Sequence, residues 1–249
     1  IGTTITVQLL SFNIAQFGLL VFAISFAIYF LTHRASLRRW MGVGMGFGLM
    51  FWGLEMISIG SHALKDFDFF ISSLNYLKEN PFLLLCVTAL FTALVQSSAA
   101  IIGIAMSLSG AGLISITDAF YCVYGANIGT TATALMASTG GNYVGRQVAW
   151  AHTIHKVVMV SLFYYLTPFI APLIESGIPQ RDVANSHLVF NVVGALVFFP
   201  FVGKLTALVE KYIQPKENEK DFSVKYLNRV NFESPSICVA HAEREIMRM

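Results

Sequence analysis

Long apolar stretches recur along the chain and are separated by short polar connections. About 20 apolar residues suffice to cross the hydrocarbon core of a bilayer. The pattern predicts five membrane-spanning helices, at residues 14–32, 41–60, 113–137, 147–174 and 183–209. Residues 61–80 mix charged and aromatic side chains, which predicts an interfacial helix or loop on the outer side. The expected fold is therefore an all-α polytopic membrane protein.

The composition agrees with this expectation. Hydrophobic residues make up 55% of the chain and charged residues only 12%, whereas soluble domains carry about 25% charged residues. The formal net charge of +2 is too small to indicate a nucleic acid partner. The lipid bilayer is the expected environment.

Basic residues set the expected orientation. Arg34, Arg38 and Arg39 lie in the connection 33–40, and basic loops stay in the cytoplasm. Eight of the sixteen Lys and Arg residues lie from Lys204 onward, which predicts a cytoplasmic C-terminus. An even number of membrane crossings must then separate the connection 33–40 from the C-terminus. Four of the predicted helices lie between them and already meet this requirement.

Residues 81–110 are left without a crossing of their own. The stretches 81–95 and 99–109 are each too short to span a bilayer. We therefore expect a re-entrant helical hairpin that dips in from outside and returns, with its tip facing a polar cavity. The tip consists of Gln96, Ser97 and Ser98.

The three side chains of this tip are candidates for ligand binding. Amide and hydroxyl groups both donate and accept hydrogen bonds, so they can coordinate a cation through oxygen or hold an oxyanion. The alternative is hydrogen bonding between helices, for which Ser and Gln also serve in membranes. Three consecutive polar groups point in different directions, which favours a binding site because buried polar groups cost free energy.

An internal repeat indicates a transporter architecture. Residues 1–11 (IGTTITVQLLS) and 128–138 (IGTTATALMAS) are identical at six of eleven positions. The expected topology makes the two copies run in opposite directions. Inverted repeats of this kind are common in secondary transporters, whose binding site lies at the repeat interface.

The segment GANIGTT combines two glycines with an asparagine inside an apolar run. Gly125 and Gly129 predict a break in the helix that would free backbone groups beside Asn127. The alternative is that the glycines allow close packing at a kink. Elsewhere, Gly42 with Gly46, and Gly44 with Gly48, form small-xxx-small faces that favour tight helix packing.

Ionisable residues inside predicted spans are functional candidates by default. Most lie near predicted helix ends, where they can cap, pair or extend to the interface, so each is a weak candidate as a direct ligand. These residues are Glu55, Asp118, His152, His155, Lys156 and His187.

Four segments, in this order and spacing, resemble the sodium–phosphate cotransporter type II family: TALVQSSAA, GANIGTTATALMAS, GRQVAWAH and NSHLVFNVVGALVFFP. The closest likeness is to bacterial members with a cytoplasmic PhoU-like helical domain. The segment SPSICVAHAEREIMRM resembles the start of that domain. The resemblance implies an inverted-repeat core with a QSSS-type motif at each of two hairpin tips, lining a central site for sodium and inorganic phosphate.

Carried over by position, the tip forms one half of that site. The resemblance adds Asn127, Thr130 and Thr131 on the adjacent broken helix and Thr3 and Thr4 on its repeat partner. Sodium is expected on the tip residues and Asn127. Ala99 replaces the third serine of the motif, and the first hairpin is missing from the sequence. These site residues are Gln96, Ser97, Ser98, Asn127, Thr130, Thr131, Thr3 and Thr4.

The same resemblance orders the chain into four parts. Residues 1–12 are the end of the first repeat's broken helix, and 13–80 are connecting transmembrane helices with an interfacial segment. Residues 81–213 form the second repeat, and 214–249 a cytoplasmic linker with the start of a PhoU-like domain. Since the chain opens without Met and stops inside an expected helix, we expect a fragment of a longer polypeptide.

The expected function is sodium-coupled transport of inorganic phosphate by alternating access, in a bacterial inner membrane. The expected partners are phosphate, sodium and lipid, with no cofactor besides the coupling ion and no enzymatic activity. The alternative is a membrane-embedded phosphate sensor or scaffold that signals through the PhoU-like domain. An intramembrane hydrolase is a weaker third hypothesis, because the sequence holds no Ser–His–Asp order and no HExxH motif. Transport direction, sodium stoichiometry and oligomeric state are open at this stage.

Overall fold

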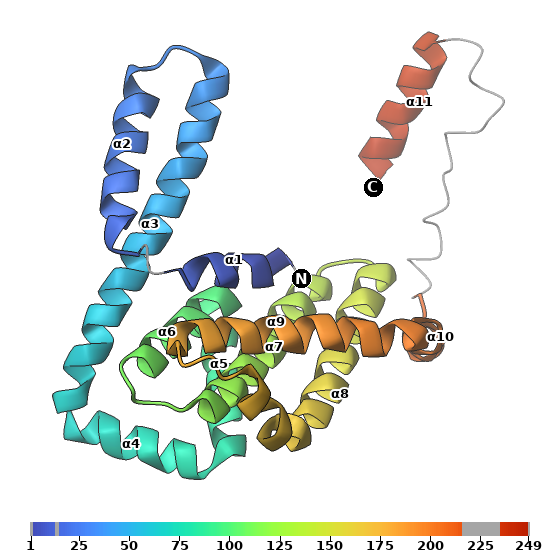
Figure 1. Ribbon diagram of the computed structural model, residues 1–249. Helices are drawn as coiled ribbons and strands as arrows, with labels where there is room; N and C mark the ends of the chain where they lie inside the picture. Colours follow the sequence, from blue (N-terminus) through green and yellow to red (C-terminus); the bar gives the residue numbers. More distant parts are fainter. Residues whose placement is uncertain (1, 13–14, 216–234, 249) are drawn as a thin grey trace.

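A computed structural model describes residues 2–12, 15–215 and 235–248, and all regular elements in these ranges are helices (Figure 1). Short 3₁₀ turns stand at Ala15–Phe17, Leu64–Asp66 and Phe199–Phe201. The α-helices are α1 Gly2–Leu10, α2 Gly18–Leu31, α3 Ala35–Ala63, α4 Asp68–Glu79, α5 Pro81–Val95, α6 Ser98–Gly110, α7 Ile116–Thr139, α8 Tyr143–Ile174, α9 Pro179–Phe198, α10 Val202–Tyr212 and α11 Pro235–Arg248.

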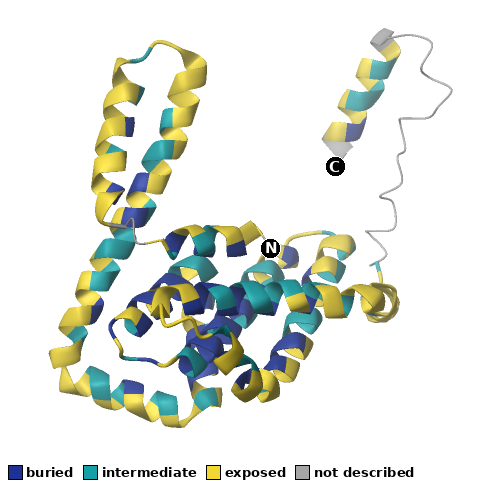
Figure 2. Cartoon of the chain, viewed as in Figure 1, coloured by how far each residue is buried: buried dark blue, intermediate teal, exposed yellow. Residues whose placement is uncertain are grey.

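Helix α7 is the centre of the fold. It packs against α5, α6, α8 and α9, and Phe120, Val123 and Tyr124 are completely buried. Figure 2 shows the buried positions gathered there, while the hairpin of α2 and α3 projects from the body and is mostly exposed. Polar side chains on α7 therefore face protein rather than lipid.

Three of the five predicted spans correspond to helices that are long and apolar enough to cross a membrane. Among the described residues these are Ala35–Asp66, Tyr143–Ile174 and Pro179–Tyr212. A fourth span is possible if α4 and α5, which are bent by 117° at their junction, count as one. The chain is thus an all-α membrane protein, as expected.

The other two predicted spans differ from the structure. Helix α2 has only 14 residues, or about 21 Å at 1.5 Å per residue, which is shorter than the hydrocarbon core of about 30 Å. Helix α7 is long enough but is absent from the candidate spans, because it carries polar residues that its enclosure by other helices permits. The segment 61–80, expected to be interfacial, contains helix α4.

The predicted hairpin at 81–110 is formed by α5 and α6. Gln96 between them has a φ of 59°, a left-handed conformation that no other described non-glycine residue adopts, and it ends α5. An added Cβ at Gly125 would meet Leu85 and Thr88, so this stretch of α5 lies against the first glycine of α7.

The directions of the helices follow from such contacts. Further along α5, Ala89 and Thr92 lie against Gly129. Residue numbers on α5 and α7 therefore increase in the same direction along the contact, so the two helices are parallel. Helix α6 packs beside α7 and is joined to it by only five residues, so α6 runs back against both.

The two IGTT copies run in opposite directions, as the repeat predicted. Helix α8 is antiparallel to both α7 and α9, so α7 and α9 are parallel. The ring pairs Phe163–Phe190 and His155–Phe198 show that α8 and α9 run in opposite directions. The Gln8 amide donates to Asn185 Oδ1 at 3.1 Å, and the end of α1 lies with the start of α9 in one pocket wall. Helix α1 is thus antiparallel to α9 and to α7.

The predicted helix break at Gly125 and Gly129 is wrong. Helix α7 is continuous from Ile116 to Thr139. Both glycines instead lie where the backbone of α5 comes closest, since an added Cβ at Gly129 would overlap Thr92 Cβ and Ala89 O. The absence of a side chain is used for close packing, which was the alternative interpretation.

Of the two glycine faces predicted on α3, one is confirmed. A Cβ at Gly48 would overlap the backbone of Phe22, and one at Gly44 would overlap the Ser25 side chain, so this face packs tightly on α2. Gly42 and Gly46 have no neighbouring atom within 4 Å of an added Cβ.

The close approach at Gly129 predicts a specific sensitivity to size. Gly129→Ala forces α5 and α7 apart, and overpacking of this kind costs about 1–3 kcal/mol. The matched control is Gly46→Ala, which adds the same methyl group to a helix with open space around it. Thermal unfolding in detergent should show a lower midpoint for Gly129→Ala and no loss for the control. Equal midpoints for the two variants would contradict the packing role.

Candidate functional site

The hairpin tip presents hydrogen-bond donors at the start of α6. The Ser97 hydroxyl accepts from the backbone N–H of Ala100 at 3.3 Å and so caps the helix. Among the described residues, the N–H groups of Ser98 and Ala99 have no recorded acceptor, as is usual at a helix start. Gln96 is exposed and Ser98 half-buried. Free N–H groups at a helix N-terminus favour an anion.

A second polar group joins three helices beside α7. The Lys156 ammonium on α8 donates to Asn127 Oδ1 on α7 and to Asn191 Oδ1 on α9, each at 2.7 Å. It also lies 5.4 Å from the centroid of the Phe190 ring. We call Asn127, Lys156 and Asn191 the lysine clamp.

Both asparagine amides of the lysine clamp are held in one orientation. The Asn127 amide nitrogen donates to Val123 O at 2.8 Å, and that of Asn191 donates to His187 O at 2.9 Å. Each nitrogen is thus satisfied by a carbonyl one turn earlier on its own helix. The two oxygens are left to point at the ammonium, which makes this a site selective for a positive charge.

Counted along α6 and α9, the hairpin tip lies in the same half of the bundle as the lysine clamp. At one end of α6, Gly110 lies against Gln180 at the start of α9. Because α6 and α9 are antiparallel, moving back along α6 to Ser98 corresponds to moving along α9 to the turn that holds Asn191. No hydrogen bond between described residues joins the tip directly to Asn127.

The remaining predicted ligands lie on α7 and α1. The hydroxyls of Thr130 and Thr131 donate to carbonyls of their own helix at 2.8 and 2.7 Å, and Thr131 is buried. On α1, Thr3 is exposed and Thr4 fully buried. Helix α1 packs on α6 and α9, so the two IGTT copies flank the same pair of helices.

Several ionisable candidates have structural roles. The Asp118 carboxylate accepts from the Ser115 N–H and hydroxyl at 2.9 and 2.8 Å and so completes a capping box at the start of α7. His155 stacks edge-on against Phe198. His187 differs from these, because it is 2% exposed and its Nδ1 has no hydrogen-bond partner among the described residues.

Sequence reasoning missed Asn191 and gave Lys156 little weight. A lysine in an apolar helix can extend to the interface or point inward, and only the positions of α7 and α9 decide between these. One pattern in the sequence links the two positions. A histidine stands four residues before each of them, His152 before Lys156 and His187 before Asn191.

Comparison with known proteins places these features in a family context. The sequence profile described as Na+/Pi-cotransporter matches residues 1–59 and 68–200, which include the hairpin tip, both IGTT copies and the lysine clamp. No solved structure matches the chain.

Three relatives illustrate the range of similarity. The uncharacterised protein YqeW of Bacillus subtilis (strain 168) is 30% identical over 218 residues, 87% of this chain and 71% of YqeW. The putative inorganic phosphate export protein YjbB of Escherichia coli (strain K12) is 27% identical over 256 residues, with 100% of this chain but 46% of YjbB covered. Sodium-dependent phosphate transport protein 2B of Bos taurus is 33% identical over 122 residues, 47% of this chain and 18% of that protein.

The lysine clamp predicts a cost for removing its charge. Lys156→Met leaves two amide oxygens without their donor, and each unsatisfied group costs about 1–3 kcal/mol. Thermal unfolding should show a clear decrease in the midpoint, while Lys65→Met at an exposed position should show none. Adding Asn191→Leu to Lys156→Met should recover part of the loss, because one orphaned oxygen disappears. Unchanged stability of Lys156→Met would rule out the clamp.

Proposed function

Because the chain belongs to the Na+/Pi-cotransporter family, we propose that it carries inorganic phosphate across the membrane, coupled to sodium ions by alternating access. The observation that carries the proposal is the family match over the segments that hold the hairpin tip and the lysine clamp. The names of two relatives support the substrate: YjbB as a putative inorganic phosphate export protein and 2B as a sodium-dependent phosphate transport protein.

Phosphate would be held by donors from two sides. The start of α6 offers the N–H groups of Ser98 and Ala99 together with the Ser98 hydroxyl. On the other side, an ammonium has three donors, and Lys156 uses two of them for Asn127 and Asn191. The third remains for a phosphate oxygen, and hydrogen bonds between ionised partners are the strong ones.

Sodium would be held by oxygen atoms of the tip and of the two IGTT copies. Gln96, Ser97 and Ser98 provide such oxygens, and Thr3, Thr4, Thr130 and Thr131 are the proposed additions. Asn127 can contribute only when Lys156 releases its oxygen, since the ammonium occupies it in this structure. The positive charge of the bound sodium ion would offset the negative charge of the phosphate.

Alternating access is supported by the opposite directions of α1 and α7. Inverted elements around one site allow two related states, one open to each side. A sensor that signals through a further helical domain is the alternative, and helix α11 beyond the charged linker is compatible with it.

A flux measurement separates these functions. Proteoliposomes containing the full-length polypeptide should accumulate labelled phosphate when a sodium gradient is applied, and replacing sodium by choline should abolish the accumulation. Phosphate binding without flux would support the sensor instead. Absence of both would contradict the proposed function.

Substitutions at the tip test the site itself. A hydrogen bond to a charged group contributes about 1.5–3 kcal/mol, so Ser98→Ala should lower phosphate flux about tenfold or more. It removes no recorded protein contact, and the unfolding midpoint should stay unchanged. Ser97→Ala should lower flux and also stability by about 1 kcal/mol, because it removes the cap of α6.

The control for both is Ser161→Ala. The Ser161 hydroxyl is exposed on α8 and donates only to Val157 O. Its variant should transport like the unmodified protein. Full phosphate flux in Ser98→Ala would remove the hairpin tip from the proposed site.

A further inference from the structure

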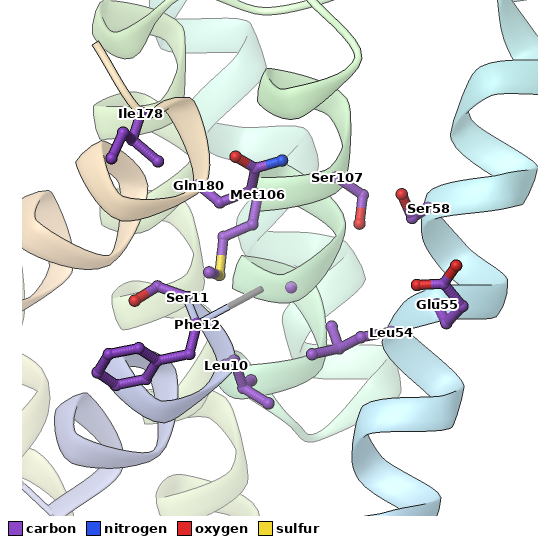
Figure 3. A pocket seen from close by; sticks show the side chains of 11 residues that line it. Leu10, Ser11, Phe12, Leu54, Glu55, Ser58, Met106, Ser107, Ile178 and Gln180 are labelled. Carbon is purple, nitrogen blue, oxygen red and sulfur yellow. The ribbon is translucent and has the colours of Figure 1, made fainter. Parts of the chain in front are cut away.

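A separate cavity, with both polar and apolar walls, lies between the end of α1, α3, α6 and the start of α9, toward the opposite end of α6 from the hairpin tip. Its volume is about 200 Å³. Figure 3 shows Glu55 and Ser58 of α3, Ser107 of α6 and Gln180 of α9 around it. The apolar part of the wall includes Leu54 and Met106. We call this the Glu55 cavity.

Glu55 is an acidic residue in an apolar helix. It is half-buried, and no other Asp, Glu, Lys or Arg occurs between Trp40 and His62. Within the part of the chain that the structure describes, its carboxylate has no recorded hydrogen bond or ion pair. An ionised group in a membrane-spanning helix is costly and is normally balanced by a positive charge. The carboxylate therefore calls for a cation from outside the described residues.

The hydroxyls near Glu55 are also free to serve a ligand. Buried Ser and Thr residues in these helices commonly donate to a carbonyl of their own helix, as Ser61 does to Ile57 O at 2.8 Å. Ser58 and Ser107 have no such recorded bond among the described residues. Ser58 follows Glu55 by three residues, so both lie on one face of α3. Their oxygens face the cavity together with the carboxylate (Figure 3).

Two glycines of α6 allow α9 and α3 to pack closely on it around the cavity. A Cβ at Gly110 would overlap the amide of Gln180, so this glycine lets the side chain lie across α6 into the cavity wall. A Cβ at Gly103 would lie 2.7 Å from Leu54 Cδ2, so α3 and α6 pack closely at the base. The oxygen atoms thus come from α3 and α6, which pack against each other.

We propose that the Glu55 cavity binds a sodium ion, at a site separate from the hairpin tip. The donor set is the carboxylate of Glu55 with the neutral hydroxyl oxygens of Ser58 and Ser107, which matches a hard monovalent cation. Divalent calcium sites gather more oxygen ligands and commonly several carboxylates. The identity of the ion as a coupling ion rests on the proposed function, but its binding does not.

The Glu55 cavity lies at the other end of α6 from the hairpin tip. Ser107 lies nine residues after Ser98 on α6, about 13 Å along the helix. The cavity is close to the loops before α7 and before α9, where Ser109, Gly112 and Glu175 line a neighbouring pocket. A sodium ion here would be held near these loops, away from the hairpin tip.

Sodium-dependent stabilisation tests the site without transport. A ligand that binds only the folded state raises the unfolding temperature, and the rise grows with the logarithm of the ligand concentration above the Kd. The purified full-length polypeptide is unfolded in detergent with sodium chloride or choline chloride at equal ionic strength and without phosphate. We expect sodium to raise the midpoint, and Glu55→Gln to reduce this rise by about half or more. Glu79→Gln, the same change at an exposed position on α4, should leave it intact.

Two further variants guard against a folding artefact. Glu55→Asp keeps the charge and should retain part of the sodium effect. The double variant Ser58→Ala with Ser107→Ala keeps Glu55 and should also weaken the effect. A full sodium effect in Glu55→Gln, or none in the unmodified protein, overturns the proposal.

Flux measurements distinguish failure of this site from failure of transport. In Glu55→Gln the sodium concentration for half-maximal phosphate flux should rise by about tenfold, with the KM for phosphate at saturating sodium unchanged. Sodium-driven flux with an unaltered sodium dependence in this variant would reject the site and keep the transporter. Glu55-dependent stabilisation by sodium in a protein without phosphate flux would keep the site and reject the transporter.

Discussion

The close contact between α5 and α7 determines how the rest of the molecule is arranged. Gly125 and Gly129 let the backbone of α5 lie directly on α7. This contact fixes the direction of α5, and the left-handed Gln96 then turns the chain back into α6. The start of α6, with its free N–H groups, is thereby placed beside the bundle core, where Ser98 is half-buried. A polar tip in an apolar environment is stable only where protein or water surrounds it, and α7 supplies one side of that enclosure.

The enclosure in turn permits the charge of Lys156. An ammonium inside a membrane protein is normally paired with an acid, yet here two amide oxygens receive it and the ring of Phe190 lies nearby. Neutral oxygens satisfy the donors without cancelling the charge. The centre of the bundle therefore keeps a net positive character, which suits an anion such as phosphate. A carboxylate in place of Asn127 or Asn191 would remove that attraction.

Apolar length was enough to predict an all-helical membrane protein, because it depends on local composition. The hairpin at 81–110 was predicted from the basic residues on either side and the parity of crossings that they require. Two predicted spans failed for different reasons. Helix α2 is shortened where η1 precedes Gly18, which no apolar count reveals, and α7 is enclosed, so its polar residues do not signal a surface. Gly125 and Gly129 illustrate a further ambiguity, since a missing side chain serves a helix break and a close contact equally well. The lysine clamp joins residues up to 64 positions apart, so its geometry depended on tertiary packing that a single sequence does not express.

Helix α6 joins two sites of opposite charge character. One end presents its N-terminal N–H groups in the same half of the bundle as Lys156, and the other borders the Glu55 cavity with its carboxylate and hydroxyls. On the proposed function, a cation is attracted first to the negative end and an anion is held at the positive end. Neither ion alone balances the charges along α6, because sodium neutralises Glu55 only and phosphate neutralises Lys156 only. Simultaneous binding balances both, and this gives a physical reason for sodium and phosphate to move together rather than separately.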